Sequence, residues 1–161
     1  MDDGSFRAVT GRVSGFLGPN GSGKSTTMRC IVGLDNPTEG RALIKGVPYS
    51  KLRSPMMTVG ALLDAKAFHP ARTAREDLKI YAGMYGLPNS RVDEILAMTG
   101  LTDVANKKVK GFSLGMGQRL GIATAMLGNP EYLLLDEPVN GLDPDGVRWV
   151  RDLVKNHAQI G

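Results

Sequence analysis

The sequence has few cysteines, few aromatic residues and no long apolar run. Cys30 is the only cysteine among 161 residues, which excludes a disulfide within the chain and is typical of a reducing compartment. No apolar segment approaches the roughly 18 residues that a membrane-spanning helix requires. The first residues, MDDGSF, are too acidic and polar for a signal peptide. Any work at a membrane therefore requires another chain or segment that holds this one there.

Charge and aromatic content also exclude one class of partner. Aromatic residues make up 6% of the chain, and the formal net charge is only +4. Such a balance suits anionic ligands or a membrane surface, but it is more often a property of solvated faces. Lys107, Lys108 and Lys110 form a short basic stretch with no aromatic residue among them. Nucleic-acid-binding surfaces combine basic and stacking side chains, so we do not expect nucleic acid as a partner.

Hydrophobic patterning predicts short apolar strands that alternate with helices. The predicted strands span residues 12–17, 41–45, 57–63 and 132–136, and the predicted helices span 24–34, 76–85, 90–99, 113–127 and 145–157. A length of 161 residues corresponds to about one domain. Apolar strands between helices favour an α/β fold, with a mostly parallel sheet flanked by helices on both faces.

A glycine-rich segment predicts a phosphate-binding loop. Residues 18–25, GPNGSGKS, match the pattern G-x-x-x-x-G-K-[ST] between a predicted strand and a predicted helix. Glycines let the backbone turn several N–H groups toward one anion, and the helix beginning near Lys24 adds its positive dipole end. Lys24 supplies a charge for the β- and γ-phosphates, and the Ser25 hydroxyl is a candidate Mg²⁺ ligand. The predicted nucleotide-binding residues are Gly18, Pro19, Asn20, Gly21, Ser22, Gly23, Lys24, Ser25 and Thr26.

Two adjacent acids follow the last predicted strand. Asp136 and Glu137 come directly after the apolar residues 132–135, at the strand end where ligands bind in open α/β sheets. Asp136 is expected to hold Mg²⁺ beside Ser25, and Glu137 to polarise the attacking water as a general base. Taken alone, this pair is equally compatible with a solvated acidic turn. Together with the phosphate loop, it predicts a catalytic site.

Two further motifs complete a family pattern. FSLGMGQR at residues 112–119 and NGLDP at residues 140–144 occur before and after the acidic strand end. In this order the motifs resemble the ATP-binding-cassette (ABC) family of transporter ATPases, with its Walker A, signature, Walker B and D-loop segments, along nearly the whole chain. The segment FSLGMGQRLGIA is most similar to the corresponding segment of bacterial exporters of the drug and antimicrobial-peptide resistance type. The resemblance implies a single P-loop NTPase domain whose core comprises residues 1–63 and 130–161, with an inserted helical subdomain at about 72–128.

The resemblance also implies a mechanism. Two such domains pair head to tail, so that ATP lies between the Walker A segment of one and the signature of the other. Ser113, Gly115, Gly117 and Gln118 are then expected to face the partner's ATP, although Ser113 also suits a purely local role as a helix cap. The family couples ATP hydrolysis, with Mg²⁺, to transport by a transmembrane permease. A cytoplasmic location on the inner face of the cell membrane follows from that partner.

Several positions depart from the family pattern. Leu114 and Met116 replace a glycine and the glutamine of the consensus LSGGQ, and they could pack against a neighbour. Asp64 stands at the Q-loop glutamine position and is a further candidate Mg²⁺ ligand. The adenine-stacking aromatic residue of the family would precede this chain, and the switch histidine would follow it, because His157 falls too early. We therefore expect a truncated domain that lacks a central strand, with sheet edges that invite strand exchange, a changed strand order or association.

Two other functions remain open at this point. The chain could bind phosphate without turnover, because the adenine platform and the switch histidine are missing. It could instead be a soluble cassette ATPase of translation or DNA repair, although it has no tandem copy and no basic or coiled-coil insertion. In the transporter interpretation, the permease would select the transported substrate.

Overall fold

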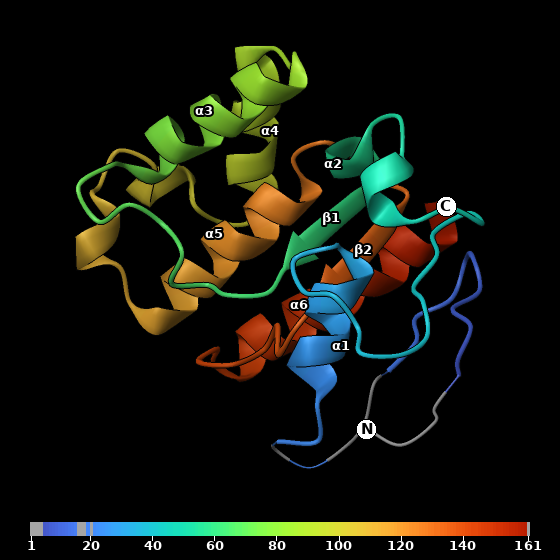
Figure 1. Ribbon diagram of the computed structural model, residues 1–161. Helices are drawn as coiled ribbons and strands as arrows, with labels where there is room; N and C mark the ends of the chain where they lie inside the picture. The colour runs from blue at the N-terminus through green and yellow to red at the C-terminus, as the bar shows by residue number, and fades with distance from the viewer. Residues whose placement is uncertain (1–4, 16–18, 20, 161) are drawn as a thin grey trace.

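The computed structural model describes residues 5–15, 19 and 21–160 (Figure 1). Within these ranges the helices are α1 (Lys24–Ile31), α2 (Pro55–Thr58), α3 (Ala74–Tyr85), α4 (Asn89–Met98), α5 (Leu114–Met126) and α6 (Pro144–Ile160), the strands are β1 (Val59–Leu62) and β2 (Tyr132–Leu135), and short 3-10 helices span Tyr49–Lys51, Thr102–Val104 and Val109–Gly111. None of the described helices combines the length and the apolar character needed to cross a membrane.

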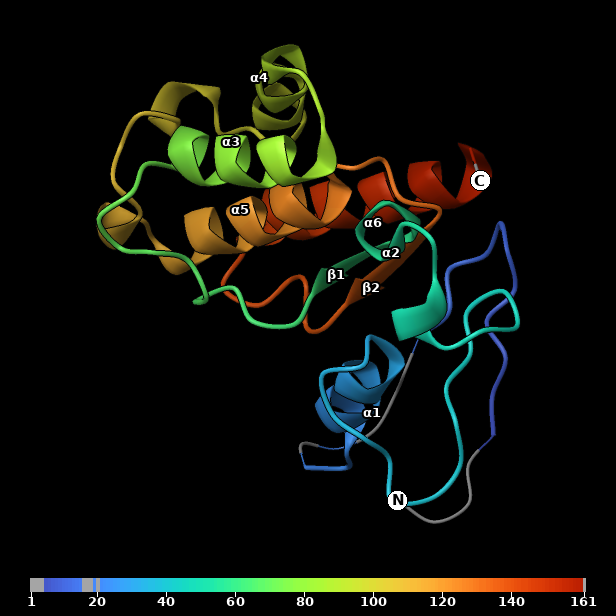
Figure 2. The same cartoon turned by 45° about the horizontal axis from the view of Figure 1, so that its top comes forward.

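The two strands form a small parallel sheet with both faces covered. Val59 lies opposite Tyr132, and Leu62 lies opposite Leu135. Because successive side chains of a strand point to opposite faces, Leu62, Leu133 and Leu135 join the cluster around α5, whereas the alternate residues join a second cluster with the end of α1. Figure 2 shows the sheet between α5 on one side and α1 on the other. The predicted α/β fold, with helices on both faces of a parallel sheet, is confirmed.

Glycines bring α5 directly onto β1. A Cβ atom on Gly60 would lie 1.8 Å from the Ala125 carbonyl oxygen, and one on Gly121 would lie 2.4 Å from Leu62 Cδ1. A Cβ on Gly60 would overlap backbone atoms, so only glycine fits there, whereas a Cβ on Gly121 would require the Leu62 side chain to shift. This close approach holds the helix in a fixed position over the strand, which matters for the site at the strand ends.

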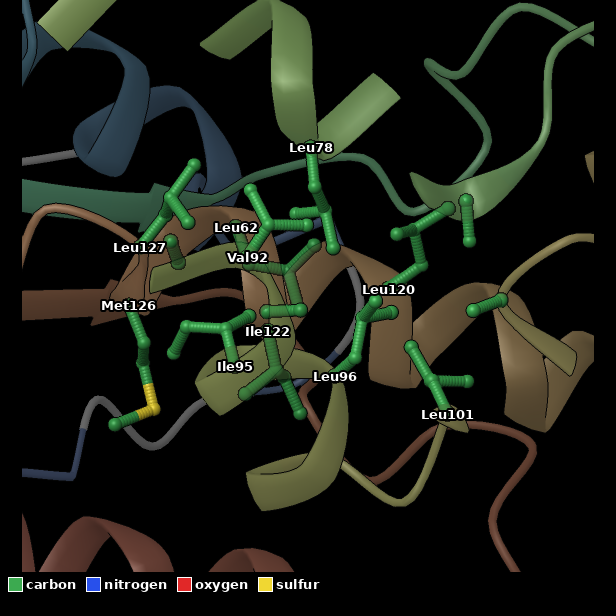
Figure 3. Close-up of a cluster of buried hydrophobic side chains, with 14 of the residues drawn as sticks. Leu62, Leu78, Val92, Ile95, Leu96, Leu101, Leu120, Ile122, Met126 and Leu127 are labelled. Atoms are coloured by element: carbon green, nitrogen blue, oxygen red, sulfur yellow. The ribbon is translucent and has the colours of Figure 1, made fainter. Parts of the chain in front are cut away.

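The largest hydrophobic cluster lies between α3, α4, α5 and the sheet. Figure 3 shows its fully or nearly fully buried side chains, which include Leu78 of α3, Ile95 of α4 and Ile122 of α5. Val150 and Leu153 of α6 belong to the same cluster. The helical part and the sheet thus share one core, and the division into a core domain and a helical subdomain stays a prediction.

Two predicted strands are absent, and a third begins later than predicted. Residues 12–15 belong to no strand and are exposed, with Val13 58% exposed, while residues 16 and 17 lie outside the described part of the chain. Residues 41–45 contribute only an isolated bridge between Ile44 and Val47. Strand β1 begins at Val59, because Pro55 starts the short helix α2 first. A strand requires a neighbour for its backbone groups, and no described strand pairs with either absent segment.

The predicted helices are all present. Ser113 precedes α5, and Thr73 precedes α3 with its side chain and that of Glu76 in a reciprocal capping box. Helix α1 ends at Ile31, three residues before the predicted end, because Gly33 takes a left-handed conformation with φ 72°. His157 lies within the last turn of α6, as expected from the sequence.

Candidate functional site

The loop before α1 has the conformation that its glycines predict. Gly21 and Gly23 lie in the left-handed region, with φ values of 81° and 85°, where residues with a side chain are strained. Ser22 N donates to Pro19 O over 3.1 Å, which closes the turn. Gly23 is the N-cap of α1, and no described side chain caps this helix end. The first N–H groups of α1 are thus presented at the loop, while Gly18 and Asn20 lie outside the described residues.

Lys24 and its neighbours line an open cavity at this helix end. The cavity has a volume of about 340 Å³, within the range of small-molecule sites, and its lining consists of Gly21, Gly23, Lys24, Ser25, Thr26 and Glu137. Lys24 Nζ donates to Pro19 O over 3.1 Å, so the ammonium group lies over the loop. Five of the nine predicted nucleotide-binding residues therefore surround one cavity, together with the predicted general base.

The Ser25 hydroxyl meets the acid at the end of β2. Ser25 Oγ donates to Asp136 Oδ2 over 2.5 Å. Asp136 N donates to Leu62 O over 2.8 Å, which extends the strand pairing and fixes the carboxylate at the carboxyl end of the sheet. Two hard oxygen ligands from two elements fit Mg²⁺, which usually takes one or two protein ligands and completes its shell with water and phosphate oxygens.

The donor set does not suit a metal held by protein alone. Among the described residues, no group of three or more His, Cys, Asp or Glu side chains could hold a metal ion. Asp64, the third predicted metal ligand, is exposed, and its Oδ1 accepts a 2.8 Å hydrogen bond from Lys66 N. Its carboxylate thus closes the turn after β1, and the structure does not group it with Asp136 and Glu137.

Glu137 has an unusual backbone conformation. Its φ is 46°, in the left-handed region that non-glycine residues rarely adopt. Its carbonyl accepts two hydrogen bonds, at 3.1 Å from Asn140 N and at 2.7 Å from Gln118 Nε2. Such a conformation costs energy and persists only where the surroundings hold it, most often at functional sites. The side chain is exposed and reaches the cavity beside Lys24 and Ser25.

The signature segment begins α5 and packs on the D-loop segment of the same chain. Ser113 Oγ accepts a 3.1 Å hydrogen bond from Met116 N, which confirms the predicted helix cap. A Cβ on Gly115 would lie 3.1 Å from Gly141 O, and one on Gly141 would lie 2.4 Å from Leu114 Cγ. Leu114, one of the two signature residues that depart from the consensus, therefore packs against Gly141. Gly117 is half-buried, and a Cβ atom on this residue would lie 3.6 Å from Ala65 O.

Gln118 is placed differently from the expectation. Gln118 is only 4% exposed, and its amide donates within the chain to the Glu137 carbonyl. This placement does not fit the prediction that Gln118 faces the nucleotide of a partner. No local pattern in the sequence indicated this contact, because the two residues lie 19 positions apart on different elements.

Comparison with known proteins identifies the family of the chain. Residues 1–140 match the model of the family described as ABC transporter. The chain is 44% identical over 158 residues to the ABC transporter ATP-binding protein YdbJ of Bacillus subtilis, covering 97% of this chain and 51% of that protein. It is 44% identical over 161 residues to the bacitracin transport ATP-binding protein BcrA of Bacillus licheniformis, covering 99% and 53%. The chain thus spans about half the length of these relatives.

Solved structures show the same fold. The dimeric structure of MJ0796, described as a bacterial ABC transporter cassette, is 28% identical with a TM-score of 0.86, covering 96% of this chain and 73% of that one. A second dimeric structure of MJ0796, in a post-hydrolysis state bound to ADP and Pi, is 29% identical with a TM-score of 0.78, covering 88% and 67%. The family match over residues 1–140, the order of the motifs and the shared fold lead to one conclusion. The chain belongs to the ABC transporter family and has the fold of its ATP-binding cassette.

Proposed function

We propose that this chain binds Mg²⁺ and ATP in the cavity beside α1 and hydrolyses ATP as the ATP-binding part of an export transporter. The observation that carries the proposal is the 2.5 Å contact between the Ser25 hydroxyl and the Asp136 carboxylate. It joins the phosphate loop to the acidic strand end at the position where a phosphate-bound Mg²⁺ would need both ligands.

Each lining residue then has a chemical task. The N–H groups of the loop and of the first turn of α1 bind phosphate oxygens. The Lys24 ammonium, which donates to Pro19 O, turns to the β- and γ-phosphates as its new acceptors. Ser25 and Asp136 hold the cation, which when bound neutralises charge on the phosphate oxygens. Glu137 accepts a proton from the attacking water, because its exposed carboxylate reaches the same cavity.

Partners follow from the family. A second cassette, paired head to tail, would place the start of its α5 on the ATP of the first, and Ser113, Gly115 and Gly117 would contact that nucleotide. The dimeric structures of MJ0796 support the pairing of two cassettes. A transmembrane permease would hold the cassette at the inner face of the membrane, and the relative named for bacitracin transport supports an export substrate of the antimicrobial-peptide class.

Binding of a fluorescent ATP analogue in the presence of Mg²⁺ tests the nucleotide site. Lys24→Ala should abolish binding, because the variant loses the only lysine in the cavity lining. Lys107→Ala is the matched control, since Lys107 is exposed and outside that lining. Release of phosphate from ATP by the wild-type protein then tests turnover. Unchanged affinity in Lys24→Ala would refute the site, and binding without phosphate release would leave a nucleotide-binding protein without ATPase activity.

A further inference from the structure

We propose that Gln118 is a positioning residue that holds Glu137 in its active conformation from within the same chain. The inference rests on the proposed function, in which Glu137 is the general base. It replaces the expectation that Gln118 contacts the nucleotide of a partner cassette. The supporting observations concern the peptide after Glu137, the packing of α5 and the burial of the Gln118 amide.

The first observation is the pair of hydrogen bonds on one carbonyl. Gln118 Nε2 donates to Glu137 O over 2.7 Å, and Asn140 N donates to the same oxygen over 3.1 Å. Together they fix the peptide plane that follows Glu137. Because Glu137 has φ 46°, this peptide has a strong tendency to relax toward a more common conformation. The two donors oppose that relaxation, and a change of the Glu137 backbone would move its carboxylate relative to the cavity.

The second observation is that the helix carrying Gln118 packs directly on strand β1. Gln118 lies on α5 one turn before Gly121, where a Cβ would lie 2.4 Å from Leu62 Cδ1. Leu62 O in turn accepts the hydrogen bond from Asp136 N, next to the base. The Gln118 amide therefore reaches Glu137 from a helix that is packed against the strand beside the site. With Gln118 only 4% exposed, the amide has little access to a second molecule.

A connection between two functional segments follows. Helix α5 begins at the signature segment, where Leu114 packs on Gly141, and it holds Glu137 through Gln118 one turn later. The contact thus joins the helix that begins at the signature segment to the predicted general base of the same chain.

The test compares Gln118→Met with the wild-type protein. Methionine has a similar length and volume but cannot donate a hydrogen bond, so the Glu137 peptide loses one of its two donors. We expect kcat for ATP hydrolysis to fall about tenfold to a hundredfold, because a misplaced base loses most of its effect. The dissociation constant of a fluorescent ATP analogue should stay within about twofold of the wild-type value, because no cavity-lining residue has changed.

Matched controls separate positioning from stability. Thr99→Val removes another buried side-chain donor, the Thr99 hydroxyl on Ile95 O, at a position away from the cavity lining. It should lower the unfolding temperature and leave kcat within about twofold of the wild-type value. Gln118→Leu provides a second variant if Gln118→Met does not fold. Its side chain also has no hydrogen-bond donor, so kcat should fall as in Gln118→Met.

The outcomes are distinct. A loss of kcat with unchanged nucleotide affinity supports the inference. An unchanged kcat in both Gln118 variants overturns it, and so does an equal loss of kcat in Thr99→Val. Weaker nucleotide binding in Gln118→Met, with kcat retained, would overturn the inference and indicate that Gln118 contacts the nucleotide. Absence of turnover in the wild-type protein overturns the proposed function itself, and this inference with it.

Discussion

The Ser25 hydroxyl and the Asp136 carboxylate, 111 positions apart in the sequence, meet in a hydrogen bond of 2.5 Å. The contact places two of the three predicted Mg²⁺ ligands at one point, at the start of α1 and the end of β2. The hydroxyl proton lies between the two oxygens. In the proposed site the cation would replace that contact.

Ser25→Ala should remove most of the Mg²⁺ dependence of nucleotide binding. We expect the wild-type protein to bind an ATP analogue about tenfold more tightly with Mg²⁺ than with a chelator, because hydrogen bonds and ligand bonds to charged groups contribute about 1.5–3 kcal/mol. The variant should show nearly equal affinities in both buffers. Ser90→Ala, an exposed position at the start of α4, is the control. A full Mg²⁺ effect in Ser25→Ala would contradict the assignment of this ligand.

Glu137→Gln should abolish turnover and preserve binding. The amide keeps the shape of the side chain but cannot accept a proton from water, so phosphate release should fall about a hundredfold or more. Glu131→Gln is the matched control, because Glu131 precedes the same strand and pairs with Lys45 on the surface at 2.9 Å. Phosphate release at the wild-type rate in Glu137→Gln would show that another group is the base.

Gly141→Ala should destabilise the protein by about 1–3 kcal/mol, because the new Cβ meets Leu114 and the backbone has φ 76°. Adding Leu114→Gly should recover the steric part of this loss, which a double-mutant cycle of urea unfolding measures. Gly83→Ala on α3 is the control, since a Cβ there meets nothing described within 4 Å. That control should be neutral or slightly stabilising. Strict additivity of the Leu114 and Gly141 changes would argue against their contact.

Asp77→Asn should stabilise the protein near neutral pH. Burial raises the pKa of the Asp77 carboxyl, an effect that the ion pair with Arg72 Nη1 at 3.5 Å reduces but does not cancel. One of its oxygens, Oδ2, is buried with no described hydrogen-bond partner. The folded state thus favours the protonated carboxyl group of Asp77. Protonation contributes to the stability of the fold at low pH, and this contribution is lost as the pH rises through the raised pKa.

The measurement is the difference in free energy of unfolding between Asp77→Asn and the wild type as a function of pH. The difference should be small below about pH 4 and grow to about 1 kcal/mol in favour of the variant above the raised pKa. Asp152→Asn, at an exposed position on α6, should show no such trend. If the advantage of the variant in free energy of unfolding shrinks as the pH rises, the ion pair with Arg72 stabilises the Asp77 carboxylate by more than its burial costs.

The sequence predicts the helices well because their signals are local. Ser113 caps α5 through Met116 N, as a serine before an apolar periodic segment should. The glycines at positions 21 and 23 turn the phosphate loop because their left-handed φ values are available to glycine at little cost. Each of these features depends on residues a few positions apart, so a single sequence contains the necessary information.

Strands were predicted less well, because a strand depends on a neighbour. Residues 41–45 contain consecutive apolar residues as β2 does, yet among the described residues only β1 and β2 pair as strands. Gly60 and Gly121 allow α5 to lie close to β1, so that this helix covers one face of the sheet. A pattern of apolar residues predicts that a segment could pair, but it does not show which partner is available.

The sequence by itself determined the residues of the phosphate loop, the acidic strand end and the caps of the helices, since these depend on side-chain chemistry and local backbone freedom. The tertiary structure decided that Ser25 meets Asp136, that Leu114 packs on Gly141, and that Glu137 keeps φ 46° under two hydrogen bonds. The physical reason is that these contacts join residues on different elements. Their energies arise only after the elements have packed, so no local pattern records them.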